Sequence, residues 1–187
     1  MELIMEDLSL HILDIAENSI TAGATNIRII INEDIKENLL FLEISDNGKG
    51  MDEEMLNNAL DPFYTTRTTR NIGLGIPFLA DAAREADGDI SIKSVKGEGT
   101  TITATFRYDN VDRKPLGDIG KTLIVIIASN PDIDIVFEHK KNTYEYLLDT
   151  SEIKKELEDV PINTPEVIKF IKKDISAWLN SIKHMIE

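Results

Sequence analysis

The sequence predicts an α+β fold in which helices alternate with antiparallel pairs of strands. Two observations carry this prediction. Apolar residues recur at helical spacing between residues 7 and 22, and again between residues 165 and 185. Two pairs of alternating, β-branched runs are each joined by a short polar turn, which is typical of hairpins. The paired runs are 26–31 with 39–45, and 90–95 with 100–106.

Length and composition indicate a globular protein with one core and a small appendage. The chain has 187 residues, of which 42% are hydrophobic and 29% charged. No apolar run approaches the roughly 18 residues that a membrane span needs. The N-terminus is acidic where a signal peptide would be basic, so we expect a cytoplasmic protein. The absence of cysteine excludes disulfides, thiolate metal sites and thiol nucleophiles.

The formal net charge of −14 opposes binding to nucleic acid or to an anionic membrane, because both attract basic side chains. One interval breaks the acidic pattern. Residues 62–80 contain no Asp or Glu and carry Arg67 and Arg70. The sequence therefore predicts that a small anion binds near this interval.

Turn and capping residues set the element boundaries in the N-terminal half. The strand over 26–31 feeds a polar turn over 33–38. A short helix capped by Asp52 ends before Asp61-Pro62, because proline disfavours helical backbone in the residue before it. A further helix begins at residues 72–76.

A polar stretch containing Pro115 divides the chain into two predicted units, 1–109 and 110–187. In the second unit, residues 118–129 are apolar on nearly all sides, so periodicity does not separate a buried helix from a buried strand. A preceding glycine and the following Asn130-Pro131 favour a helix. We expect a small α+β region in which this helix precedes a hairpin, 133–139 with 143–148, and two helices, 151–157 and 165–185.

The last predicted helix places seven apolar side chains on one face, and this stripe requires a cover. Packing within the same region is one reading, and a helix-mediated homodimer is the other. More generally, residues 110–187 are where we expect a protein partner to bind. The stripe consists of Val167, Phe170, Ile171, Ile175, Trp178, Leu179 and Ile182.

The stretch over residues 45–51, Ser-Asp-Asn-Gly-Lys-Gly-Met, follows a strand that ends at a carboxylate. Gly48 and Gly50 leave the backbone free to adopt positive φ and to let a bound group approach closely, while Asp46 offers an acceptor. This combination predicts a ligand-facing loop. An ordinary hairpin turn is the alternative reading of Asp-Asn-Gly.

Two further clusters point to the same kind of site. Asp14 and Asn18 are four residues apart in the first helix, so their side chains project side by side, with His11 one turn earlier. A solvated helix face is the alternative reading. Gly73 and Gly75 at the start of a later helix bare its N-terminal amides, which favour a phosphate.

The order of these stretches resembles the GHKL ATP-binding domain, which is shared by histidine kinases, anti-sigma-factor serine kinases, DNA gyrase, MutL-type mismatch-repair proteins and a class of heat-shock chaperones. The resemblance covers about residues 5–108. It implies a two-layer α/β sandwich, the Bergerat fold. The matching boxes are 17–25 (ENSITAGAT), 46–51 (DNGKGM), 61–67 (DPFYTTR), 73–75 (GLG) and 99–100 (GT).

By this resemblance the boxes bind ATP and Mg²⁺. Asn18 would ligate the magnesium ion that bridges the phosphates. Asp46 would accept a hydrogen bond from the exocyclic amine of adenine, and Thr100 would help to hold the same base. The other nucleotide-binding residues that the resemblance implies are Ala22, Gly48, Gly50, Met51, Phe63, Arg67, Gly73, Leu74 and Gly75.

Departures from the family pattern bear on catalysis. In the ATPase branches a glutamate four residues before the asparagine is the general base, and here Asp14, one methylene shorter, takes that position. A general base must reach its proton within roughly 3 Å, directly or through one water. Asn71 stands where kinases commonly have the first glycine of the lid. His11, His139 and His184 match no dimerisation helix with a phospho-acceptor, so the sequence does not resemble a self-contained sensor kinase.

We therefore expect a stand-alone Mg-ATP-binding regulatory module that acts on a protein partner. As an enzyme it would be a kinase acting in trans on serine or histidine, or an ATPase with Asp14 as its catalytic base. The alternative is an adaptor without catalysis, either gated by ATP or independent of nucleotide.

Overall fold

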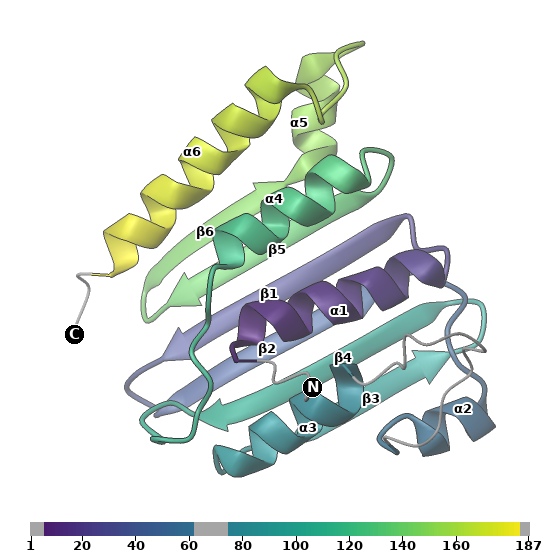
Figure 1. Ribbon diagram of the computed structural model, residues 1–187, viewed down its shortest axis with the longest axis vertical. Coiled ribbons are helices and arrows are strands. Elements are labelled where there is room, and N and C mark those ends of the chain that lie inside the picture. The colour runs from purple at the N-terminus through teal and green to yellow at the C-terminus, as the bar shows by residue number, and fades with distance from the viewer. Residues whose placement is uncertain (1–5, 62–74, 184–187) are drawn as a thin grey trace.

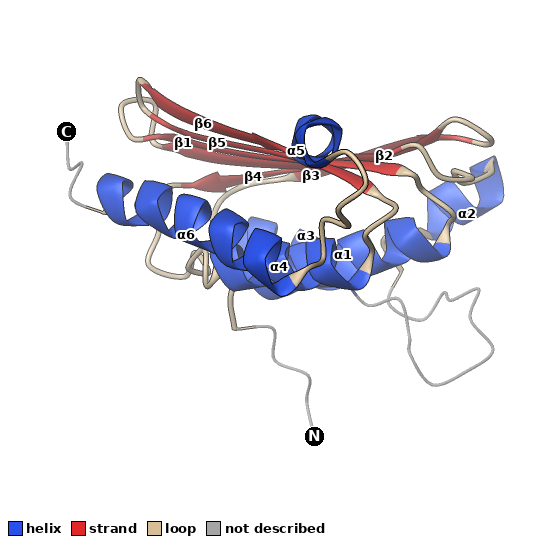
Figure 2. Ribbon diagram, turned by 90° about the horizontal axis from the view of Figure 1, so that it is seen from above, coloured by secondary structure: helices blue, strands red, loops and turns tan. Residues whose placement is uncertain are grey.

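The computed structural model describes residues 6–61 and 75–183. Within these residues six strands form one sheet in the order β3-β4-β2-β1-β5-β6 (Figure 1). Helices α1, α3, α4 and α6 lie along one face of the sheet (Figure 2), which confirms the predicted α+β class and two-layer sandwich. The strands are β1 (Asn26–Asp34), β2 (Leu39–Asp46), β3 (Ile90–Val95), β4 (Gly99–Arg107), β5 (Asp134–Lys141) and β6 (Tyr144–Asp149). The helices are α1 (Leu8–Thr21), α2 (Glu53–Asn58), α3 (Gly75–Glu85), α4 (Ile119–Ser129), α5 (Thr150–Leu157) and α6 (Pro165–Ile182).

The N-terminal elements form where the local sequence predicts them. Asp7 caps α1 by accepting a hydrogen bond from the amide of Leu10 at 3.1 Å, and Gly23 ends the helix at a φ of +79°. β2 lies between β1 and β4 and is antiparallel to both. Its register places Asp46 directly opposite Thr100. Two residues that are far apart in the sequence thereby meet at one end of the sheet.

The prediction that Glu33 begins a turn is wrong, because β1 continues through Asp34. The Glu33 side chain faces the helices and is 6% exposed. It accepts hydrogen bonds from His139 Nε2 at 2.9 Å and from the Tyr108 hydroxyl at 3.1 Å. These distant partners offset the cost of burying a carboxylate, so the strand extends past the point where its apolar run ends.

The C-terminal elements continue the same sheet. β5 pairs with β1 in parallel, and β6 pairs with β5 antiparallel. The ambiguous segment 118–129 contains a helix, α4, which packs between α1 and α6. Two helical neighbours and the sheet explain its apolar character on nearly all sides. Strands from both predicted units, 1–109 and 110–187, therefore belong to one continuous sheet. The division into these two units stays a prediction.

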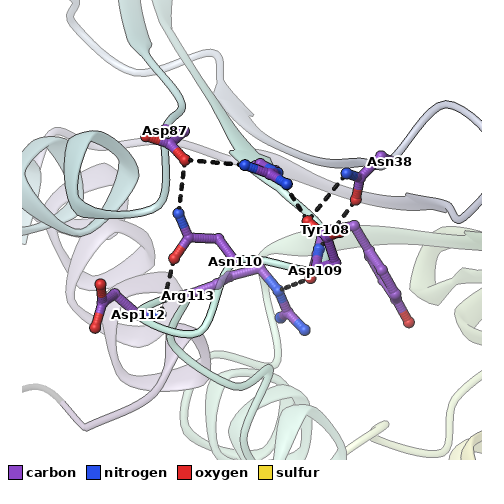
Figure 3. Close-up of polar contacts among 8 residues, drawn as sticks. Asn38, Asp87, Tyr108, Asp109, Asn110, Asp112 and Arg113 are labelled. Atoms are coloured by element: carbon purple, nitrogen blue, oxygen red, sulfur yellow. Dashed lines mark hydrogen bonds and ion pairs between the residues drawn. The ribbon is translucent and has the colours of Figure 1, made fainter.

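The segment that joins the two predicted units is held by polar contacts (Figure 3). Asn38 donates to Asp109 from its side chain and accepts from the amide of the same residue, both at 3.0 Å. Asn110 donates to Asp87 at 2.9 Å. Arg113 lies over the ring of Tyr108 and donates to its carbonyl oxygen at 2.7 Å. This network fixes the start of the connection to α4 against the turns of the N-terminal strands.

The apolar stripe of α6 is covered in part within the chain. Ile171 and Ile175 are fully buried, and α6 packs against α4 close to Gly120. Phe170, by contrast, is 66% exposed. No helix among residues 6–61 and 75–183 is long and apolar enough to cross a membrane.

Candidate functional site

The first side of the site is the middle of α1. Asp14 and Asn18 lie one turn apart and are joined by a hydrogen bond of 3.3 Å from the Asn18 amide nitrogen to Asp14 Oδ2. Both side chains are partly exposed, unlike Ile15, which faces the core. Because the amide nitrogen is the donor in this bond, the carbonyl oxygen is the atom of Asn18 that is suited to bind a cation. The pair therefore presents oxygen atoms along one edge of the helix.

Asp46, the last residue of β2, contacts α1 next to Asn18. Its Oδ2 accepts a hydrogen bond from the Ser19 hydroxyl at 2.7 Å, and its Oδ1 accepts one from the amide of Gly48 at 2.8 Å. One donor comes from a helix and the other from the loop that follows the strand. The carboxylate is thus fixed on both oxygens, and about two of its four lone-pair positions remain for a ligand.

The loop over residues 47–51, called the glycine loop below, is shaped by two places where its backbone lies close to neighbouring atoms. Gly50 has a φ of +62°, and a Cβ there would lie 2.1 Å from the carbonyl oxygen of Val95. A Cβ on Gly48 would come within 3.1 Å of Ala22, the residue that ends α1. The carbonyl of Ala22 accepts from the amide of Lys49 at 2.9 Å. The loop therefore packs against the end of α1 and the β3–β4 turn, and it keeps Asp46 between them.

Thr100 belongs to a small hydroxyl cluster beside Asp46. Its hydroxyl lies 2.8 Å from that of Ser94 on β3. Ser94 in turn accepts a hydrogen bond from the amide of Met51 at 2.8 Å and donates to the carbonyl of Gly99 at 2.9 Å. Strands β3 and β4 and the glycine loop are joined through this one serine.

The N-terminus of α3 forms the second side of the site. Gly75 is its first residue and is buried against Asp14, so close that a Cβ would lie 1.9 Å from Asp14 Oδ2. The first amides of a helix have no partner within it and carry a partial positive charge. His11 adds no cation nearby, since burial lowers the pKa of its imidazole. The amides of α3 are therefore the described groups best suited to meet an anion beside Asp14 and Asn18.

The structure brings together most of the site residues that the sequence predicts. Asp14, Asn18 and Ala22 lie on α1 or at its end, and Gly75 lies against Asp14. Asp46, Gly48, Gly50, Met51 and Thr100 lie together where β2, β4 and the glycine loop meet. Phe63, Arg67, Gly73 and Leu74 lie outside the described residues, and the roles expected for them stay predictions.

Sequence reasoning missed Ser19 and Ser94, the two serines that hold this site together. Both carried a usable signal, because each is a polar residue at a position where the pattern calls for an apolar one. Ser19 continues the buried face of α1, and Ser94 continues the face of β3 that begins with Ile90 and Ile92. A buried hydroxyl needs a partner, so such positions indicate a polar contact.

Comparisons with known proteins match this chain to one family. The family model described as "Histidine kinase-, DNA gyrase B-, and HSP90-like ATPase" matches residues 5–110. The tetrathionate sensor histidine kinase TtrS of Salmonella typhimurium is 35% identical over 100 residues, which is 51% of this chain and 16% of that protein. The sensor histidine kinase WalK of Bacillus subtilis is 33% identical over 91 residues, which is 46% of this chain and 15% of that protein. These matches span about a sixth of either relative.

A solved structure shares the fold. It is the N-terminal domain of a DNA repair protein, which superposes with a TM-score of 0.55 at 19% sequence identity. The alignment covers 78% of this chain and 53% of that one, so it extends past the region that the family model matches.

Proposed function

The chain belongs to the family of histidine kinase-, DNA gyrase B- and HSP90-like ATPases, and from this premise we propose that it binds ATP with Mg²⁺ between α1, the end of β2 and the start of α3. The observation that carries the proposal is the meeting of three chemical functions in one place. These are a fixed carboxylate at Asp46, an oxygen-bearing pair at Asp14 and Asn18, and a helix N-terminus at Gly75.

Asp46 and Thr100 form the adenine end of the proposed site. An ionised carboxylate only accepts hydrogen bonds, so it pairs with the exocyclic amine of adenine and not with the carbonyl that guanine carries at the same position. The glycine loop brings backbone close to the base without side chains in the way. Under this proposal Thr100 contacts the same base, and its position opposite Asp46 in the strand register supports this.

Asn18 and the first amides of α3 form the phosphate end. Mg²⁺ is commonly held by one or two protein oxygens together with substrate phosphates, and Asn18 beside Asp14 fits that pattern. When bound, the ion would neutralise charge on the phosphates. The described residues contain no cluster of three or more acidic or histidine side chains that would hold a metal alone. Magnesium is therefore expected to bind together with the nucleotide.

Calorimetric titration with a non-hydrolysable ATP analogue, with and without Mg²⁺, tests this proposal. We expect binding that strengthens with Mg²⁺, and we expect Asn18→Ala to remove that strengthening while adenosine still binds. Equal binding of the analogue with and without Mg²⁺ by the wild-type protein would remove the assignment of Asn18. Folded protein that binds neither analogue nor adenosine would overturn the nucleotide site.

We further propose that bound ATP is used in phosphoryl transfer or hydrolysis on behalf of a protein partner, with Asp14 as the base. Two observations support Asp14 in this role. It contacts Asn18, and from α1 it lies against Gly75 at the N-terminus of α3. Asp14→Asn should retain ATP binding and lose product formation. Labelled phosphate on a partner identifies a kinase, and free phosphate identifies an ATPase.

An ATP-gated adaptor is the second candidate. The continuous sheet favours it, because β5 pairs directly with β1 and links the C-terminal helices to the nucleotide site. Under this proposal the nucleotide changes the surface that residues 110–187 offer to a partner. Binding of ATP without either product, together with partner binding that depends on ATP, would distinguish the adaptor from the enzyme.

A further inference from the structure

We propose that Ser19 is a positioning residue that fixes Asp46 and thereby sets the preference for adenine over guanine nucleotides. This inference rests on the proposed nucleotide site and goes beyond it, because Ser19 would act through Asp46 and not by touching the ligand.

The contact between the two residues is short and partly buried. The Ser19 hydroxyl lies 2.7 Å from Asp46 Oδ2 and 3.2 Å from the carbonyl oxygen of Ile15. A hydroxyl has a single proton, and the shorter distance together with the charge of the acceptor assigns that proton to Asp46. Ser19 is only 3% exposed, so its hydroxyl has little access to water as an alternative partner.

This bond fixes the plane of the carboxylate. With the Gly48 amide at 2.8 Å on Oδ1 and the Ser19 hydroxyl on Oδ2, turning the carboxylate plane about the Cβ–Cγ bond would disrupt both charge-assisted hydrogen bonds. The remaining lone pairs are therefore held in constant directions. A base that presents an amine there gains a well-aligned bond, and a base that presents a carbonyl meets a fixed negative charge.

A purely structural role for Ser19 has a matched comparison in the same helix. Ser9 is also 3% exposed, and its hydroxyl also donates to an aspartate, Asp7 Oδ1, at 2.6 Å. Asp7 caps α1 and lies far along the helix from Asp46. Ser9→Ala therefore removes the same kind of bond from the same helix without touching the proposed site.

The test compares Ser19→Ala and Ser9→Ala by calorimetric titration with non-hydrolysable ATP and GTP analogues. We expect Ser19→Ala to weaken ATP binding about tenfold, which corresponds to one hydrogen bond to a charged group, and to leave GTP binding nearly unchanged. The ratio of the two affinities should then fall about tenfold. Ser9→Ala should lower the melting temperature without changing the ratio.

Ser19→Cys keeps the shape of the side chain, with a somewhat larger sulfur atom, and replaces the hydroxyl by a weak donor in a chain that has no other cysteine. It should show the same loss of selectivity for ATP over GTP. If the alanine variant does not fold, the cysteine variant supplies this measurement. If the wild-type protein binds ATP and either folded Ser19 variant keeps the wild-type ratio of ATP to GTP affinity, only the role of Ser19 is overturned. A folded wild-type protein that binds neither analogue overturns the nucleotide site, and the role of Ser19 with it.

Discussion

At the scale of single residues, Asp46 is the side chain on which the proposed choice of nucleotide depends. It receives one hydrogen bond from α1 and one from the glycine loop, so its direction is set by two elements at once. Its position opposite Thr100 follows from strand register and requires no distortion. A substitution that keeps its size but changes its hydrogen-bonding character should therefore act on binding more than on the fold.

Asp46→Asn should weaken binding of a non-hydrolysable ATP analogue about tenfold or more. The amide presents a donor where the adenine amine needs an acceptor, and one hydrogen bond to a charged group is worth about 1.5–3 kcal/mol. Calorimetric titration measures the affinity, and thermal unfolding confirms that the variant is folded. Asp132→Asn, at an exposed turn, is the control. Wild-type affinity in the folded variant would remove Asp46 from the site.

Gly75→Ala should weaken ATP binding about tenfold and leave adenosine binding nearly unchanged. The new Cβ would lie 1.9 Å from Asp14 Oδ2, so the Asp14 side chain, which contacts Asn18 at the phosphate end, must shift. Gly120→Ala in α4 is the matched control, because its Cβ would meet Ile175 at an ordinary 3.4 Å. That variant should be about 0.5–1 kcal/mol more stable with unchanged binding. Equal loss of ATP and adenosine binding in Gly75→Ala would contradict the assignment of the phosphate end.

At the scale of elements, a buried polar chain joins β1, β5 and α6. Glu33 accepts from His139 Nε2 at 2.9 Å, and the Trp178 indole donates to His139 Nδ1 at 3.1 Å. An indole N–H only donates, so Nδ1 must accept and the imidazole carries its proton on Nε2. The Tyr146 ring stacks on Trp178, and its hydroxyl donates to Asp174 of α6 at 2.6 Å. These contacts fix α6 against the C-terminal strands.

Glu33→Gln should lower the free energy of unfolding by about 2 kcal/mol at neutral pH, and the difference from wild type should shrink in acid. Burial raises the pKa of Glu33, but hydrogen bonds from His139 and Tyr108 and the charge of Lys141 outweigh it, so the pKa lies below 4.5. A lowered pKa contributes stability above about pH 4.5 that is lost as the pH falls through the folded value.

Denaturant unfolding at a series of pH values between about 7 and 3 measures this difference. Glu37→Gln, in the exposed turn after β1, is the control and should follow the wild-type curve. Parallel curves for Glu33→Gln and wild type throughout the range would show that Glu33 is not held ionised by its partners.

Local sequence patterns predicted most helices and strands. The features that these patterns did not predict depend on tertiary contacts. Asp14, Asn18 and Asp46 could be predicted as site residues, because helical spacing and the end of a strand indicate their positions without knowledge of the fold. The position of Ser19 on the buried face indicated a polar contact, but its partner could not be predicted, because Asp46 is 27 positions away and is chosen by how α1 packs on β2. Glu33 was placed in a turn for the same reason, since its hydrogen-bond partners lie in β5 and beyond β4.

At the scale of the whole molecule, one sheet connects the nucleotide-binding region to the C-terminal helices. The parallel pairing of β5 with β1 is non-local, and no periodicity in either strand specifies it. The helix-covered face contains the proposed site. The opposite face has a depression whose lining includes Ile30, Phe41 and Leu147, which alternate along their strands with residues that face the helices. These two places are physically distinct, so a bound nucleotide can be assigned to one of them.

The most direct test is an experimental structure of the protein with Mg²⁺ and a non-hydrolysable ATP analogue. We predict that the adenine amine lies within about 3 Å of Asp46, and that the metal lies on the Asn18 carbonyl oxygen with the phosphates at the start of α3. A nucleotide bound in the depression on the opposite face, or one whose base does not contact Asp46, would contradict the account.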